Sequence, residues 1–492
     1  MEIKTEKNMK DKILLLLLFI AISTIFLLFF SWTTSPLYDC MSLDSNIFKL
    51  MGHFTKEGMI PYKDMFDHKG PILVFVEWIG CLISSNKTGI FFVQVIFWTI
   101  SLCGTYKLLG LFFGRRGSCW LSIGSLMYFF LFLNWGNTTE EICLPFLIWS
   151  TYFAYTFFTK YQKEHNKYYA LFYGITFMVG AFTRLTNALP LCILVIIGMI
   201  ELVRQKKWEN VIQNIIFFII GVLIIIIPVF IWFAANGALG DMIYATFIYN
   251  FKYAVENATQ KTLFEFIKFS IRYFTPFVLA IIVSIVAIKK KRYVPIAISV
   301  IVTSIIAIAF QLNSAMYEHY LMIWTPCVLM AFGLGCEIIK EGQKTKCIIS
   351  CCAICFIAIC SIGDLLLIKD SVHIYRDNSA EAYREEVHEI MNLIPESEKD
   401  AVVAYNVDPA FYIESGLKPC YRNFVLQDFQ CQYDEKMRNE FEEDICSLKA
   451  KYIVEVVGKD NRMDNFIDEF YEEVTRTRSL ILLRKNNLFS FN

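Results

Sequence analysis

The sequence predicts an all-α polytopic membrane protein with about eleven transmembrane helices, followed by a small C-terminal extracytoplasmic α/β domain. Two observations predict this class. Hydrophobic residues make up 56% of the 492 residues and charged residues only 19%, against about 25% charged in ordinary globular domains. The apolar residues are also gathered in long blocks. Residues 13–30 carry no charge, and a run of that length lets a helix cross a hydrocarbon core of roughly 30 Å.

The apolar blocks give the expected positions of the helices. They are 13–31, 88–113, 117–135, 142–159, 169–183, 185–203, 211–234, 273–288, 294–311, 321–339 and 347–368. Residues 71–84 are apolar but too short to span, so we expect an interfacial or partly embedded helix there. The first block follows a basic segment, as in a secretory signal. It is longer than a signal core and lacks a clear small-residue cleavage site, so we expect it to be retained.

The basic residues between the blocks predict the orientation, because cytoplasmic loops of membrane proteins are enriched in Lys and Arg. With the N-terminus inside, every short basic cluster falls on the same side. These clusters are Arg115 and Arg116; Lys160, Lys163 and Lys167; Arg204, Lys206 and Lys207; Lys289, Lys290, Lys291 and Arg292; and Lys340, Lys344 and Lys346. We therefore expect a multi-pass protein of the cell membrane with a cytoplasmic N-terminus and an extracytoplasmic C-terminus.

The expected domains are a transmembrane part, 1–368, and a polar α/β domain, 369–492. The transmembrane part has outer loops at 32–87, 134–141 and 235–272, the last rich in the aromatic residues that favour the headgroup level. In the tail we expect strands at 401–405, 451–457 and 479–485 and helices near 408–415, 433–447 and 461–473. The net charge of zero gives no general attraction to nucleic acid. A disulfide among the tail cysteines, Cys420, Cys431 and Cys446, is left open.

The first outer loop carries carboxylates in a chain that has few charges. Asp39, Asp44, Asp64 and Asp67 all lie within it. The spacing of its apolar residues between 44 and 58 is helical and predicts an amphipathic helix on the membrane surface. Asp44 would open this helix as its N-cap. The alternative is an ordinary solvated loop in which Asp44 only caps.

Two segments resemble the GT-C superfamily of glycosyltransferases, in its branch of bacterial mannosyl- and aminoarabinose-type transferases. After the first helix come Asp44, Gly58 and "PYKDMFDHKGP" at 61–71, and the second outer loop reads "GNTTEEICLP" at 136–145. Weaker similarities are "TRLTNALP" at 183–190 and "EHYLMIWTP" at 318–326. The resemblance covers residue 1 to about 340 and says little about the tail.

The resemblance implies a GT-C-like fold and transfer of a sugar from a polyprenyl-phosphate donor to a cell-surface acceptor at the outer face. An acceptor hydroxyl needs a carboxylate base, and the leaving phosphate needs fixed cations. By resemblance, Asp44 is the expected general base and Lys69 the phosphate-binding lysine, with Arg184 as a second phosphate ligand. The other expected substrate-binding residues are Glu140, Glu141, Asp64, Asp67, His319 and Tyr320.

No cofactor is assigned. Glu140 and Glu141 are candidates to hold the acceptor or a divalent cation, but the acidic pair that some members use for metal is not clear, so the metal ligands are unknown. His68 departs from the family pattern and is given no role. The partners expected from the resemblance are the lipid donor, membrane lipid and an acceptor that is a glycan, a lipid or a protein.

Each of these residues also has a structural alternative. Arg184 would snorkel to the interface, Glu140 would cap a helix, His319 would fill space and Lys69 would anchor the loop. A transporter or flippase for lipid-linked saccharides is the main competing function, but such proteins show internal repeats and broken helices, and we find neither. A polymerase or ligase for surface polysaccharide stays open, as do the sugar and the acceptor.

Overall fold

The computed structural model describes residues 2–160, 164–252, 262–314 and 316–486. The chain forms two compact units, each built from three separate stretches. The helical unit comprises Met1–Leu37, Phe91–Phe230 and Asn257–His373, and the mixed unit comprises Tyr38–Ile90, Ile231–Glu256 and Ile374–Asn492.

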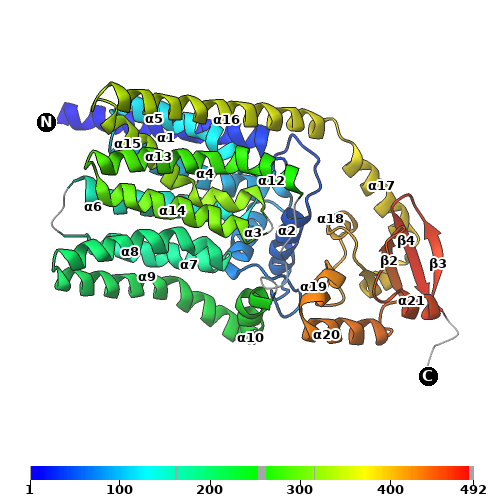
Figure 1. Ribbon diagram of the computed structural model, residues 1–492. Helices are drawn as coiled ribbons and strands as arrows, with labels where there is room; N and C mark the ends of the chain where they lie inside the picture. The colour runs from blue at the N-terminus through cyan, green and yellow to red at the C-terminus, as the bar shows by residue number, and fades with distance from the viewer. Residues whose placement is uncertain (1, 161–163, 253–261, 315, 487–492) are drawn as a thin grey trace. The chain divides into compact units, whose positions relative to one another are not determined.

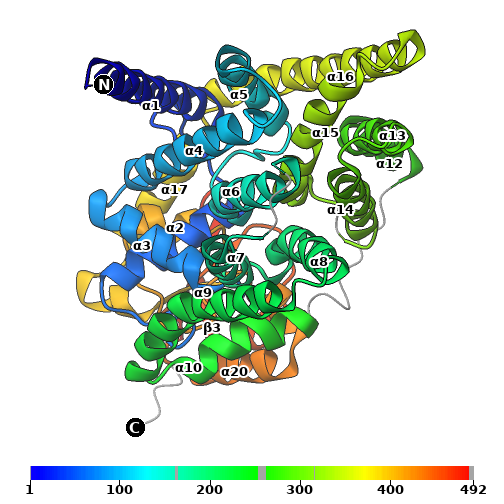
Figure 2. The same ribbon diagram turned by 90° about the vertical axis from the view of Figure 1, so that its left-hand side faces the viewer.

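Every helix predicted from an apolar block has a counterpart in the structure. They are α1 (Glu2–Phe30), α4 (Lys87–Leu109), α5 (Arg115–Phe130), α6 (Thr139–Thr159), α7 (Lys167–Ala181), α8 (Leu189–Arg204), α9 (Trp208–Ala235), α13 (Thr275–Lys289), α14 (Val294–Leu312), α15 (Thr325–Ile338) and α16 (Gln343–Tyr375). Figures 1 and 2 show them packed side by side, with their long axes roughly parallel. The fold class, a multi-pass helical membrane protein, is confirmed.

Two of these helices are shorter than a membrane span. In the described ranges, nine helices are long and apolar enough to cross a membrane. α5 has 16 residues and α7 has 15, which is short of the roughly 20 that a span needs. Eleven crossings therefore stays a prediction.

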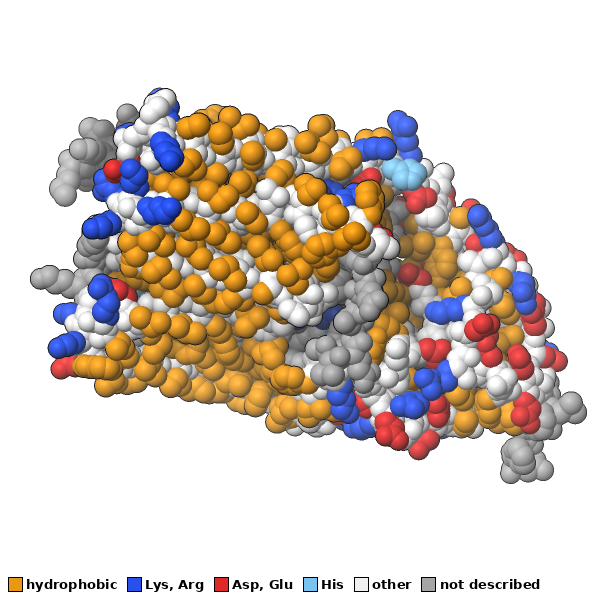
Figure 3. All heavy atoms as spheres, viewed as in Figure 1, with side chains coloured by type: hydrophobic (Ala, Val, Ile, Leu, Met, Phe, Trp, Pro, Cys, Tyr) orange, Lys and Arg blue, Asp and Glu red, His pale blue; other side chains and the backbone are white. Residues whose placement is uncertain are grey.

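The basic connections of the helical unit lie together. Arg115 Nη1 is 2.9 Å from Asp11 Oδ2, so the start of α5 lies beside the start of α1. Arg292, between α13 and α14, pairs with Glu341, between α15 and α16, at 3.0 Å. Figure 3 shows Lys and Arg at the end of the helices where the N-terminus lies, beside a broad hydrophobic belt. This arrangement is the one that the alternating basic clusters predict; which side of the membrane it faces stays a prediction.

The mixed unit combines the first outer loop with the tail. Its helices are α2 (Leu43–Lys56), α3 (Pro71–Ile83), α10 (Leu239–Ile243), α17 (Ser379–Asn392), α18 (Ala410–Ser415), α19 (Gln427–Tyr433), α20 (Glu435–Cys446) and α21 (Asp464–Phe470). The predicted amphipathic helix is α2 and the predicted short apolar helix is α3. A Cβ at Gly52 would lie 2.6 Å from the Glu77 backbone carbon, so glycine lets α2 pack closely against α3.

The tail contains a four-stranded sheet. Its strands are β1 (Val402–Ala404), β2 (Tyr452–Val456), β3 (Tyr471–Arg476) and β4 (Leu480–Lys485), in the order β1-β2-β4-β3. β1 and β2 are parallel, and β4 is antiparallel to both of its neighbours. Val403, Ile453 and Leu483 of the sheet pack with Tyr405 and Phe441 in one core. The three predicted strands are confirmed, whereas β3, α17 and α19 were not predicted.

The predicted outer loop 235–272 contains α10, a π-helical turn at Tyr244–Tyr249 and the short α12 (Leu263–Phe269). Residues 253–261 of this loop lie outside the described residues. The expected position of its aromatic residues, at the level of the lipid headgroups, stays a prediction. Cys420, Cys431 and Cys446 are free thiols in the structure.

Candidate active-site residues

Asp44 lies in the first turn of α2, and its side chain is exposed. The prediction that Asp44 is the N-cap is wrong. The N-cap position belongs to Ser42, which has the extended backbone that a cap requires (φ −138°, ψ 122°). Among the described residues, none donates a hydrogen bond to the Asp44 carboxylate. It therefore faces solvent at a helix end whose partial positive charge favours an anion.

Asp67, His68 and Lys69 form a chain of contacts. Lys69 Nζ lies 2.8 Å from His68 Nε2, and His68 Nδ1 lies 3.5 Å from Asp67 Oδ1. An ammonium can only donate, so Nε2 accepts and the ring proton sits on Nδ1, facing the carboxylate. The Lys69 ammonium also lies 5.9 Å from the centre of the Phe48 ring, one helical turn from Asp44. His68, which sequence reasoning gave no role, thus fixes the position of Lys69.

The charge of Asp44 also acts on Asp67 of this chain of contacts. Burial raises the pKa of Asp67, the Lys69 charge and backbone N–H lower it, and the negative charge of Asp44 raises it. The Asp67 side chain is 7% exposed, and its Oδ2 accepts from the Lys69 N–H at 3.2 Å. One ammonium and two carboxylates of the mixed unit therefore interact electrostatically.

Asp64 has a local contact instead. Its Oδ2 accepts from the Ile60 N–H at 2.7 Å, which closes the turn before the Lys69 segment. The hydroxyl of Tyr62 donates to the Lys69 carbonyl at 2.7 Å and holds the segment from the other side. Asp64 is therefore part of the support of this loop, and its role in substrate binding stays a prediction.

In the helical unit, Arg184 is held from two sides. Its Nη1 lies 3.5 Å from Glu140 Oε1, and its guanidinium carbon lies 3.5 Å from the centre of the Tyr320 ring. Glu140 is 1% exposed and Arg184 is 22% exposed. The stacked, paired guanidinium has a fixed direction, unlike a side chain that snorkels freely. Three residues that are far apart in the sequence thus meet at the start of α6.

Glu141 has a structural role beside them. Thr138 and Glu141 form a capping box at the start of α6, so the alternative that Glu140 is the cap is wrong. Trp98 Nε1 donates to Glu141 Oε1 at 2.7 Å, and Gln94 Nε2 donates to its Oε2 at 3.2 Å. Sequence reasoning missed Trp98 and Gln94, although the Thr138–Glu141 spacing itself is a readable capping signal.

His319 adjoins the same cluster. It lies in the 3-10 helix Glu318–Trp324, is 8% exposed and packs edge-on against Tyr320, with ring centres 4.5 Å apart. Its Nδ1 lies 2.9 Å from Asn134 Nδ2. Asn134, Trp135 and Asn137 all have positive φ (45°, 71° and 61°), and such strained backbone persists only where its surroundings enforce it. Asn134 is a further residue that sequence reasoning missed.

No metal ligands can be assigned. Within the part of the chain that the structure describes, no group of three or more His, Cys, Asp or Glu side chains is placed to hold an ion. The carboxylates of Glu140 and Glu141 are occupied by Arg184 and by the capping contacts, respectively. A divalent cation therefore has no proposed position.

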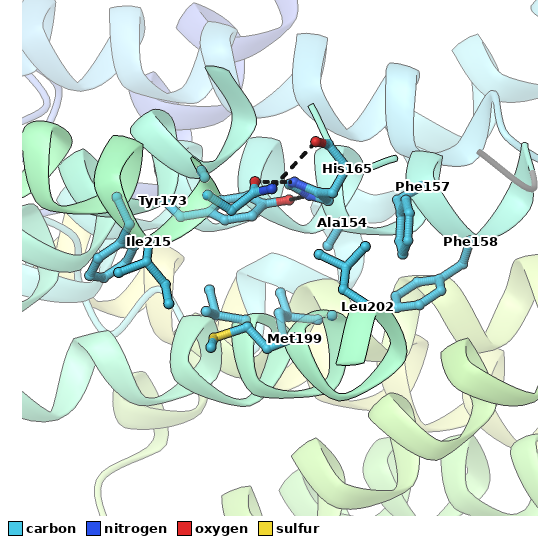
Figure 4. A pocket seen from close by; sticks show the side chains of 14 residues that line it. Ala154, Phe157, Phe158, His165, Tyr173, Met199, Leu202 and Ile215 are labelled. Atoms are coloured by element: carbon cyan, nitrogen blue, oxygen red, sulfur yellow. Dashed lines mark hydrogen bonds between the residues drawn. The ribbon is translucent and has the colours of Figure 1, made fainter. Parts of the chain in front are cut away.

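The helical unit also contains an apolar cavity. It has a volume of about 170 Å³, lies among α6, α7, α8 and α9, and is lined almost entirely by apolar side chains such as Phe157, Met199 and Leu202. Its histidine, His165, bonds Asn214 Oδ1 at 2.7 Å and the Tyr173 hydroxyl at 3.1 Å, as Figure 4 shows. The polar groups here bind one another, so the cavity offers no reactive group.

Comparison with known proteins shows what this chain is similar to. Residues 68–232 match the family model of the dolichyl-phosphate-mannose-protein mannosyltransferases. The fold resembles that of ArnT from Cupriavidus metallidurans, solved with undecaprenyl phosphate, with a TM-score of 0.52 and 12% identity over 96% of this chain and 98% of ArnT. The chain has the fold of the GT-C membrane glycosyltransferases, and the family model over a third of it agrees with that enzyme class. The predicted resemblance, fold class and enzyme class are confirmed.

A further structure agrees with this assignment. The archaeal oligosaccharyltransferase AglB from Archaeoglobus fulgidus, in complex with an inhibitory peptide and a dolichol-phosphate, has a TM-score of 0.52 and 11% identity over 97% of this chain and 76% of AglB. No curated protein matches the chain by sequence. The family match begins at His68, so it includes Lys69, Glu140 and Arg184 but neither Asp44 nor His319.

Proposed function

We propose that this glycosyltransferase moves a sugar from a polyprenyl-phosphate donor to a cell-surface acceptor at the outer face of the membrane. The observation that carries the proposal is the position of Lys69. A chain through His68 to the buried Asp67 holds its ammonium, and the exposed carboxylate of Asp44 lies in the same electrostatic neighbourhood. A fixed cation beside an accessible base is what phosphate-leaving transfer requires.

The transfer is a single displacement. The acceptor hydroxyl oxygen attacks the anomeric carbon as the bond from that carbon to the phosphate oxygen breaks. The hydroxyl proton passes to the Asp44 carboxylate, and the bonding electron pair leaves with the polyprenyl phosphate. Lys69 stabilises the charge that develops on this phosphate. Solved structures of similar fold contain undecaprenyl phosphate or a dolichol-phosphate, which supports this donor class.

Residues of the helical unit have further proposed roles in substrate binding. Arg184, oriented by Glu140 and Tyr320, offers further donors to a phosphate group. His319 lines the same cluster, and Glu140 keeps the guanidinium from turning away. Glu141 and Asp64 act through structure, by holding the start of α6 and the turn before Lys69.

The proposed orientation has a cytoplasmic N-terminus and an extracytoplasmic tail, with the transmembrane part at 1–368 and the outer domain at 369–492. The basic connections gathered at the N-terminal end of the helical unit support it. A reporter that fluoresces only in the cytoplasm, fused after Asn492, should stay dark in intact cells. Bright cells would reverse the orientation.

The experiment that tests the function is a transfer assay with the purified chain in nanodiscs. A panel of radiolabelled undecaprenyl-phosphate sugars is supplied with membrane acceptors, and released undecaprenyl phosphate and labelled product are measured. We expect both to appear together and to depend on the protein. Movement of labelled lipid across vesicles without release of undecaprenyl phosphate would instead indicate a flippase.

A further inference from the structure

A polar cavity of the mixed unit lies on another face of α2 from Asp44. It has a volume of about 390 Å³ and is lined by Asn46, Lys49 and His53 of α2. These residues follow one another at three- and four-residue steps and so share one side of the helix. Asp44 and Phe48, also four apart, lie on a different side. The cavity is therefore separate from the Lys69 region but only a helix diameter of roughly 10 Å away.

The tail supplies the opposite wall. Arg384 of α17 and Glu414 of α18 line the cavity together with Asp39 and Lys87. Arg384 Nη2 bonds Asp39 Oδ2 and its Nε bonds Glu414 Oε2, both at 2.8 Å, while Lys87 Nζ donates to the Tyr38 carbonyl. These charge-assisted contacts hold the wall in place before any ligand arrives.

The cavity lining has equal numbers of positive and negative side chains. Three cations and three carboxylates line the cavity, namely Lys49, Lys87, Arg384, Asp39, Glu77 and Glu414. A phosphate site would show an excess of positive charge. A balanced set of donors and acceptors instead matches hydroxyl groups, each of which can donate and accept. The volume falls within the range of about 300–1,000 Å³ that small-molecule sites occupy.

One of the carboxylates of the lining is buried. Glu77 is 1% exposed. Burial lowers the pKa of Lys49 to about 8, while the charge of Glu77 raises it. Polar groups taken out of water in this way favour a ligand that can share hydrogen bonds with them. Ser85 and Asn86 also line the cavity, and both are exposed.

We propose that this cavity binds an uncharged sugar unit of a saccharide acceptor, one that does not itself react. The inference rests on the proposed function and deepens it: the acceptor is an oligosaccharide or polysaccharide that reaches from the cavity past α2 toward Asp44. The tail then contributes to acceptor binding, because Arg384 and Glu414 form part of the cavity wall.

The test uses the full-length chain in nanodiscs, with an array of uncharged and anionic oligosaccharides as the probe. Ser85→Trp places an indole at the exposed part of the lining, and its matched control Ser85→Ala adds no bulk there; position 85 is exposed, so both variants should fold. Binding of undecaprenyl phosphate, measured in parallel, reports on the donor side alone.

We expect the wild type to retain uncharged oligosaccharides, Ser85→Trp to weaken their binding by about tenfold or more, equal to about 1.4 kcal/mol, and Ser85→Ala to change it little. Glu414→Gln should weaken it several-fold through a lost charge-assisted bond. Equal binding by Ser85→Trp, no bound saccharide in the wild type, or binding of anionic glycans alone would each overturn the inference. If the wild type does not bind undecaprenyl phosphate, the result would instead count against the proposed function.

Discussion

Replacing Asp44 by Asn separates a catalytic role from a structural one. The structure limits the structural cost, because Asp44 is exposed, lies inside the first turn and does not cap α2. What Asn loses is the favourable position of a negative charge at a helix start, worth about 0.3–1 kcal/mol. If Asp44 is the base, turnover should fall by about 10²-fold or more, which is about 2.7 kcal/mol in the barrier. The catalytic effect thus exceeds the structural one severalfold.

The assay is transfer of radiolabelled sugar from a polyprenyl-phosphate donor by purified wild type and Asp44→Asn, with thermal unfolding of both measured alongside. Glu57→Gln is the matched control, because Glu57 is a half-exposed carboxylate at the other end of α2. Its rate should equal that of the wild type. Asp44→Glu should keep little activity, since its carboxylate is displaced by one methylene.

Equal rates for wild type and Asp44→Asn would remove Asp44 from the mechanism. The base would then have to be sought among Asp39, Asp64, Asp67, Glu140 and Glu141. Each of these carboxylates already has a protein partner in the structure, so each would have to release it.

Three further outcomes are expected. Lys69→Ala should raise the apparent dissociation constant for the donor, and Lys69→Arg should lower it again in part. His68→Leu should weaken donor binding less than Lys69→Ala; donor titrations measure all three. Glu141→Ala should lower the melting temperature, because the buried Trp98 N–H loses its acceptor at a cost of about 1–3 kcal/mol. Burial raises the pKa of Asp67, so its contribution to stability is present below about pH 3.9 and is lost as pH rises through the higher folded-state pKa. Asp67→Asn should therefore lose less stability than wild type on going from about pH 4 to pH 7, as melting temperatures at each pH will show.

The helices were predictable because their signal is long and local. An apolar run near 20 residues has few alternatives to a membrane or core helix, and α2 shows its buried face in its own spacing. β3 was missed for the opposite reason. It is the edge strand of the sheet, and most of its side chains are exposed and polar, so it lacks the apolar alternation that identifies a strand.

The candidate residues divide in the same way. Candidate residues that are neighbours in the sequence could be assigned to one site. Arg184, Glu140 and Tyr320 were all predicted to bind substrate, but their contacts with one another were not predicted. Which carboxylate caps α6 was readable from the Thr138–Glu141 spacing, while the bridging role of His68 required the side-chain geometry. An imidazole between an acid and an amine leaves no periodic signal, because it acts through two contacts that depend on a single turn of the loop.

The tail makes contacts between residues far apart in the sequence. Some of these contacts hold the loop that carries Lys69. The Phe66 N–H donates to the Arg422 carbonyl at 2.8 Å, and Arg422 Nε donates to the Tyr62 carbonyl at 2.7 Å. The Arg422 guanidinium in turn pairs with Glu440 of α20 at 2.8 Å. Residues more than 350 positions apart therefore fix the backbone that precedes Lys69. Since fixed donors stabilise a leaving phosphate better than mobile ones do, the tail contributes to the proposed chemistry through this support as well as through the saccharide cavity.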